Sequence, residues 1–123
     1  MKVLICASGN TGRLSPFVQE QAESLIILGI QVDYFLISGK GILGYLKNYS
    51  SFMKMIKDKK YDLVHAHYGL SGLLATLQKK TPVIVTFHGS DVNIKKTLPF
   101  SLLASRLSRN NIFVHSSLAR RLK

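Results

Sequence analysis

The residues best suited to chemistry are histidines that end apolar segments of the chain. His88 closes the apolar run 83–87 and stands directly before the turn residues Gly89, Ser90 and Asp91. A polar side chain at the end of a buried strand projects into the space beyond the sheet, so His88 is the candidate catalytic residue.

A second pair of histidines lies upstream, in the segment 62–69. Residues two apart on a strand share a face, so His65 and His67 can point the same way. With His88 and Asp91, they could supply the three or more ligands that a metal-dependent hydrolase needs. In the competing interpretation, His65 is a hydrogen-bonded core histidine and Asp91 caps the following segment. Stoichiometric zinc in the purified protein would favour the hydrolase.

The loop Asn10, Thr11 and Gly12 follows the first apolar segment and precedes a predicted helix. Small residues at a helix N-terminus let backbone N–H groups approach an anion. The loop does not match the three-glycine dinucleotide pattern. Asp33 lies near the start of its strand rather than the end, where an acid that binds ribose belongs, so a nicotinamide cofactor is not expected.

Short apolar runs that position these residues recur along the chain and alternate with helical patterns. The runs lie at about 2–7, 31–37, 62–67, 83–87 and 111–115. They are mostly continuous, as is typical of strands covered on both faces of a parallel sheet. Ser15 and Pro16 predict the start of the first helix, and Gly29 its end. The pattern predicts an α/β fold: a three-layer Rossmann-like domain with about five parallel strands and helices on both faces.

Charge is the least ordinary feature of the composition. Seventeen Lys and Arg against six acidic residues give a formal net charge of +11. This balance predicts attraction to a polyanion: a nucleic acid, a nucleotide diphosphate or an acidic membrane surface. A basic nucleic-acid-binding module is therefore an alternative function, although the chain has no RNA-stacking motif. Steeply salt-dependent oligonucleotide binding would favour it.

One predicted helix, 43–59, carries part of this charge. Its apolar residues cluster on one side, and Lys47 and Lys54 lie roughly opposite, with Lys57 toward the flank. This face is either an ordinary solvated surface or one that attracts anionic lipid. The apolar stripe is Tyr45, Tyr49, Phe52 and Ile56. We expect Tyr45 and Tyr49 to be core residues rather than membrane anchors.

The length of 123 residues suits a single domain, 1–123. No apolar run approaches the roughly 20 residues of a membrane span, and the N-terminus lacks the pattern of a signal peptide. The single cysteine, Cys6, cannot form an internal disulfide and is expected in the core. A cytoplasmic location is expected.

Two segments of the chain are distinctive: Tyr-Asp-Leu-Val-His-Ala-His at 61–67 and Pro-Val-Ile-Val-Thr-Phe-His-Gly-Ser-Asp-Val at 82–92. Together they resemble the N-terminal half of family-4, GT-B-fold retaining glycosyltransferases. The segments 15–22 and 39–41 are similar to the first helix and the loop after the second strand of a bacterial subgroup. The resemblance covers essentially the whole chain.

The resemblance implies two Rossmann-like domains with the active site between them. Residues 1–123 would be the N-terminal, acceptor-side domain, without the C-terminal donor-binding domain, and inactive alone. The complete enzyme would transfer a sugar with retention from a nucleotide sugar to a glycan or lipid-linked acceptor. Bacterial surface polysaccharide or glycolipid synthesis is the implied setting, at the inner face of the plasma membrane if lipid is bound. No metal or tightly bound cofactor and no nucleic acid is implied. Partly from the family and partly from the crossover rules, the strand order is expected to be 3-2-1-4-5.

The resemblance also implies roles for individual residues. Gly12 would contact the donor diphosphate through its backbone, and His88 would hydrogen-bond the transferred sugar. The remaining candidates for substrate or donor binding are Asn10, Thr11, His67, Gly89, Ser90 and Asp91. One departure is His115, because the family often has a small serine at the end of this strand.

Overall fold

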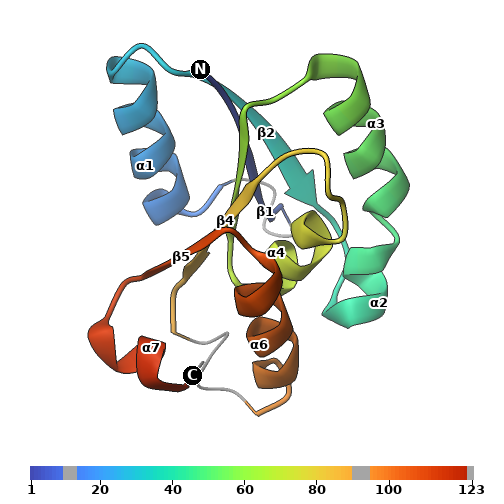
Figure 1. The fold of residues 1–123 in the computed structure, drawn as a ribbon, viewed down its shortest axis with the longest axis vertical. Helices are drawn as coiled ribbons and strands as arrows, with labels where there is room; N and C mark the ends of the chain where they lie inside the picture. The colour runs from blue at the N-terminus through green and yellow to red at the C-terminus, as the bar shows by residue number, and fades with distance from the viewer. Residues whose placement is uncertain (10–13, 90–94, 122–123) are drawn as a thin grey trace.

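A computed structural model describes residues 1–9, 14–89 and 95–121 of the chain. It contains one sheet of five parallel strands in the order β2-β1-β3-β4-β5 (Figure 1). The strands are β1 (Lys2–Ser8), β2 (Gln31–Ile37), β3 (Leu63–His67), β4 (Val83–Phe87) and β5 (Asn110–Phe113). The helices are α1 (Pro16–Ile27), α2 (Gly41–Leu46), α3 (Tyr49–Lys59), α4 (Gly69–Thr76), α6 (Leu98–Leu107) and α7 (Ser116–Arg121).

Each face of the sheet packs against its own helices. α1 places Val18 and Ala22 against Val3, Ile5 and Ala7 of β1. The intervening β1 residues, including the buried Cys6, face a larger core to which α3 and α4 contribute. Figure 1 shows α1 on one side of the strands, and α2, α3, α4 and α6 on the other. The predicted α/β architecture with helices on both faces is confirmed.

The expected strand order, 3-2-1-4-5, is wrong, because β3 pairs with β1 and β4 instead of lying outside β2. The handedness of the crossovers links this order to the placement of the helices. When two successive right-handed crossovers run in opposite directions across the sheet, their helices lie on opposite faces of it. Phe52 and Ile56 of α3 pack on the face opposite α1, so the chain turns back past β1 after β2.

Burial explains why β2, and not β3, occupies the edge of the sheet. Residues 64–67 of β3 are all buried, whereas in β2 only Ile37 is. A strand that is covered on both faces is suited to the middle of a sheet, and a half-exposed strand to its edge.

The first helix begins and ends as its sequence predicts. The Ser15 hydroxyl accepts a hydrogen bond from the Val18 N–H, and Pro16 occupies the first turn, where its missing N–H costs nothing. Leu28 caps the end of the helix, and Gly29 follows with a φ of 88°, a conformation that glycine adopts without strain.

The prediction of a single helix over 43–59 is wrong. The structure has two helices there, α2 and α3, which are separated by residues 47–48. The side chain of Asn48 accounts for the break. Its Nδ2 donates to the carbonyls of Gly44 and Ser38, and its Oδ1 accepts from the Ser38 N–H. A side chain that competes for backbone groups interrupts a helix, and here it also ties the interruption to the end of β2.

Helices α4 and α6 pack unusually closely where α4 begins. A Cβ atom added to Gly69 would collide with the Ser101 side chain and lie only 3.1 Å from Ser101 Cα. Gly72, one turn later, similarly accommodates Val85 of β4. Glycine at these positions lets α4 lie against both the sheet and α6, which fixes the place of the turn that precedes α4.

Candidate active site

The carboxyl ends of β1 and β3 lie side by side where the chain reverses direction across the sheet. From β1 the chain leads outward to β2, and from β2 it returns to β3, β4 and β5 on the other side of β1. In open α/β sheets, ligands bind beyond the strand ends at such a point. β3 ends at His67, and His88 directly follows β4. Both candidate residues therefore lie at the edge where a ligand is expected.

The structure brings the three histidines together. The rings of His65 and His67 stack with centroids 4.5 Å apart, so the two side chains point the same way, as their spacing predicts. His65 Nε2 lies 2.7 Å from Thr86 Oγ1. His67 Nδ1 lies 3.0 Å from His88 Nε2. His65 is paired with Ile5 of β1, so this cluster is on the α1 side of the sheet.

Burial keeps the two strand histidines neutral. Their exposed fractions are 5% for His65 and 1% for His67. Desolvation, reinforced by the charge of neighbouring histidines, lowers the pKa of His65 to about 4 and that of His67 to about 3. His67 Nε2 is buried and has no hydrogen-bond partner among the described residues. A proton at neutral pH can therefore occupy only one nitrogen of each ring.

Tyr68 links the histidine cluster to α4 through a strained backbone. Its φ of 74° and ψ of 155° fall in a region that is essentially restricted to glycine. The Tyr68 N–H donates to the Thr86 carbonyl at 2.9 Å. The phenol ring stacks on His88 with centroids 4.3 Å apart. Such strain persists only where the surroundings impose it, and here it holds an aromatic ring against His88.

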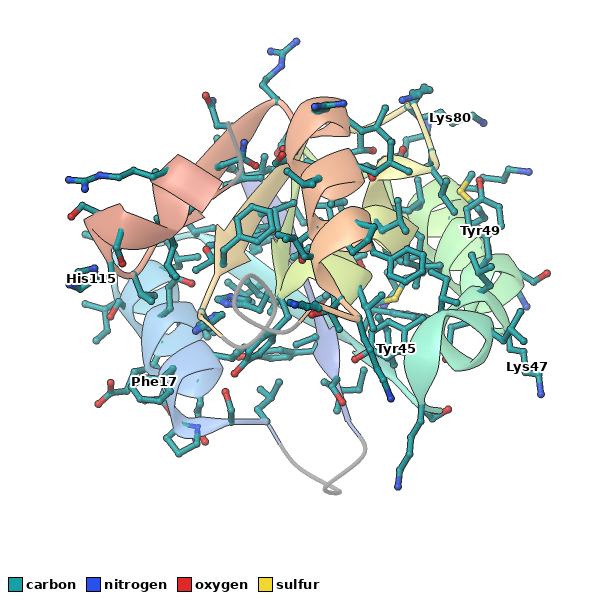
Figure 2. The ribbon with its side chains drawn as sticks, turned by 90° about the horizontal axis from the view of Figure 1, so that it is seen from below. Phe17, Tyr45, Lys47, Tyr49, Lys80 and His115 are labelled. Atoms are coloured by element: carbon teal, nitrogen blue, oxygen red, sulfur yellow. The ribbon has the colours of Figure 1, made fainter. Side chains whose placement is uncertain are left out.

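A groove of about 510 Å³ opens beside His88. Its exposed apolar residues are Phe17, Ile112 and Val114, at 70%, 41% and 57%. Phe17 comes from the first turn of α1 (Figure 2), and its ring centroid lies 6.5 Å from that of His88. The remaining lining residues are Gln21, His67, Tyr68 and Thr86. A mainly apolar concavity with a few convergent polar groups is typical of a small-molecule site.

Several sequence-predicted site residues lie outside the described part of the chain. They are Asn10, Thr11, Gly12, Ser90 and Asp91. Gly89 is described and has a φ of 129°, so its backbone takes a conformation that a side chain would strain. His115 follows β5, is exposed, and interacts with Ser117 Oγ through Nδ1 at 2.8 Å.

The metal-site interpretation finds no support in the residues that the structure describes. Within them, no three His, Cys, Asp or Glu side chains are arranged to hold a metal ion. Two of the ring nitrogens are already engaged: His65 Nε2 with Thr86, and His67 Nδ1 with His88. Asp91 lies outside the described residues.

The predicted basic surface is divided between two elements. Lys47 ends α2, whereas Lys54 and Lys57 lie on α3, and all three are exposed. Figure 2 shows Lys47 projecting outward and Tyr45 directed toward the body of the molecule. Tyr45 and Tyr49 pack against the core, as predicted. Next to Lys47, α2 exposes Leu43 and Leu46, at 74% and 40%. None of the described helices is long and apolar enough to cross a membrane.

Sequence reasoning missed most residues of the groove, namely Phe17, Gln21, Tyr68, Thr86, Ile112 and Val114. Tyr68 directly follows His67, so adjacency to a candidate residue was the available signal, although nothing in the residue type indicates a positive φ. Gln21 comes from another element, and only the fold brings it to the groove.

Comparison with known proteins identifies the family of the chain. A family model described as glycosyl transferase 4-like matches residues 14–117, which include α1 and every histidine of the site. A search of curated proteins finds none that matches the chain.

Proposed function

Because the chain belongs to the glycosyl transferase 4-like family, we propose that it contributes His88 to the transfer of a sugar from a nucleotide-sugar donor. The acceptor is a glycan or a lipid-linked molecule, and the configuration at the sugar is retained. Bacterial surface polysaccharide or glycolipid synthesis is the proposed setting. The observation that carries the proposal is the position of His88, at the carboxyl edge of the sheet and beside an open groove.

Sugar transfer requires protein groups that stabilise a developing positive charge on the sugar and a developing negative charge on the phosphate. As the bond between the anomeric carbon and the diphosphate breaks, positive charge develops on the sugar and negative charge on the phosphate. A neutral histidine can hold a sugar hydroxyl without opposing the developing cation. The buried, neutral His65 and His67 add no positive charge behind His88. Gly12 and its neighbours are proposed to bind the diphosphate.

The domain organisation is part of the proposal. Residues 1–123 would form the acceptor-side domain, and the donor would be held mainly by a second domain that closes the cleft. The groove beside Phe17 and Val114 is open and apolar on one side, which suits an incomplete site. The domain alone is therefore expected to lack turnover at an enzymatic rate.

A peripheral contact with anionic lipid is proposed for the surface of Lys47, Lys54 and Lys57. Each well-placed lysine can contribute about 1 kcal/mol of attraction to an anionic bilayer. The exposed Leu43 and Leu46 add apolar area beside Lys47. Binding of this kind is electrostatic and reversible.

Turnover by the complete protein tests the role of His88. A panel of uridine, guanosine, adenosine and thymidine diphosphate sugars would be assayed for nucleoside diphosphate release, and NMR would give the anomer of the product. His88→Ala should lower kcat by about 100-fold or more. Because His88 stacks on Tyr68, the substitution should also cost about 1 kcal/mol of stability.

The matched control is His115→Ala, which removes an exposed imidazole on the next strand end. It should leave kcat within about twofold, because the exposed His115 side chain does not line the groove. Normal turnover in the His88 variant would remove this residue from the mechanism. An inverted product would refute retention.

A further inference from the structure

We propose that His67 is a positioning residue that sets the tautomer of His88, with His67 Nδ1–H donating to His88 Nε2. The two nitrogens are 3.0 Å apart, a direct hydrogen-bond distance with a single proton between them. Either His67 donates and His88 accepts, or the reverse. The two arrangements differ in where each ring keeps its proton.

The burial of His67 distinguishes them. If His88 donated, neutral His67 would carry its proton on Nε2, which is buried and has no partner among the described residues. An orphaned buried N–H is rare in native proteins, and a buried acceptor without a partner is tolerated more often. Protonating both nitrogens would place a charge on a ring that is 1% exposed. The favoured state is a neutral His67 with its proton on Nδ1.

The consequence for His88 follows from the chemistry of imidazole. A neutral ring whose Nε2 accepts must carry its proton on Nδ1. Nδ1–H is then the single N–H donor of the His88 ring. An imidazolium at His88 would set two N–H groups against each other, so His67 also disfavours the charged form. The value of this for sugar transfer rests on the proposed function, whereas the tautomer itself does not.

The neighbouring contacts restrain the rings in this arrangement. His65 stacks against His67 and is itself engaged with Thr86. Tyr68 stacks on His88. Neither histidine can easily rotate without breaking one of these contacts.

Nitrogen-15 NMR of histidine-labelled complete protein at neutral pH tests the tautomer without any assay of activity. Two-bond correlations identify which ring nitrogen of His88 carries the proton. We expect Nδ1–H at His88 and Nδ1–H at His67 in the unsubstituted protein. A proton on His88 Nε2 would overturn the proposal, and this measurement needs no variant to fold.

Two substitutions then test whether His67 is the cause. In His67→Asn, the amide nitrogen occupies the place of Nδ1 and can still donate, so His88 should keep Nδ1–H. In His67→Phe, the donor is lost and His88 should shift toward Nε2–H. Unchanged far-UV circular dichroism would report an intact fold. If the tautomer of His88 is the same in His67→Phe, His67 does not set it.

Turnover gives the functional readout. His67→Phe should lower kcat about tenfold or more with little change in the KM for the donor. The kcat of His67→Asn should stay close to that of the unsubstituted protein. A rise in KM at unchanged kcat in His67→Phe would indicate direct substrate contact instead and overturn the positioning role. If His88→Ala proved fully active, the proposed function would fail while the tautomer result would stand.

Discussion

The backbone of Tyr68 stores free energy at the point where β3 passes into α4. A residue with a side chain in this conformation costs about 1–3 kcal/mol, and the surrounding structure must supply it. Here the Tyr68 N–H is bonded to the Thr86 carbonyl, and the ring is stacked on His88. The strain therefore coincides with the candidate site.

Two substitutions that both remove the ring separate the strain from the stacking. Tyr68→Gly can adopt the positive φ freely, whereas Tyr68→Ala cannot. The greater entropy of unfolded glycine offsets part of the relief. We expect the glycine variant to be more stable than the alanine variant by about 1 kcal/mol in urea unfolding. Equal stability, or a more stable alanine variant, would show that the turn is not strained.

At this scale, the sequence predicted what depends on local pattern. His67 and His88 could be identified because each ends an apolar segment that becomes a strand, and strand ends in a parallel sheet meet at one edge. Phe17 and Val114 could not be linked to them, because their approach depends on how α1 and β5 pack. The direct bond between His67 and His88 was likewise beyond prediction.

At the scale of elements, α2 and α3 show how a side chain can interrupt a regular pattern. The apolar spacing of Tyr45, Tyr49, Phe52 and Ile56 continues through residue 48, and all four contact the core. Periodicity therefore located the buried side correctly. Periodicity could not predict that the Asn48 side chain bonds to Gly44 and Ser38, because the bond to Ser38 forms only when the end of β2 lies nearby.

Vesicle co-sedimentation tests the lipid contact that is proposed for these two helices. With vesicles containing anionic lipid at low salt, Lys47→Glu combined with Lys54→Glu should weaken binding on the order of 30-fold or more. Binding of the unsubstituted protein should fall at physiological salt, because the attraction is screened.

The matched control reverses two other exposed lysines, Lys79 and Lys80, which lie between α4 and β4. Lys79→Glu combined with Lys80→Glu changes the net charge equally but leaves the α2 and α3 surface intact. Equal weakening by both pairs would mean that net charge alone attracts the lipid. If the protein does not bind the vesicles at low salt, the surface of Lys47, Lys54 and Lys57 is an ordinary solvated one.

At the scale of the whole molecule, the strand order determines which loops can share a site. The α/β class followed from alternation, but the order did not, because right-handed crossovers allow the chain to continue beyond β2 or to return past β1. The burial of the strands agrees with the observed order, because β2 is half-exposed and the end of β3 is fully buried. The observed order makes β1 and β3 the strands that flank the reversal, which places His67 there.

The buried histidines make global stability depend on pH. The unfolded pKa of histidine is about 6.5, and the folded values are about 4 for His65 and about 3 for His67. Below about pH 6.5 the unfolded chain binds more protons, so the free energy of unfolding falls as the pH falls. Each histidine approaches a slope of about 1.4 kcal/mol per pH unit until its folded pKa is reached.

Urea unfolding between pH 7 and pH 4.5 measures this dependence. Stability should be constant above the unfolded pKa and decline below it, and His67→Phe should make the decline shallower. The carboxylate of Asp33, whose pKa is lowered chiefly by the hydrogen bond from Tyr61, loses its contribution at more acidic pH. A flat profile across this window would contradict the burial of neutral histidines.

The close contact between Gly69 and Ser101 limits how this domain can be rebuilt. Because no side chain fits between the start of α4 and α6, the turn that bears Tyr68 cannot move independently of α6. A chimaera that transplants only the segment from β3 into α4 would set a foreign helix start against Ser101. The interchangeable unit for transplanting this part of the candidate site is therefore the β3–α4 turn together with α6, taken as one block.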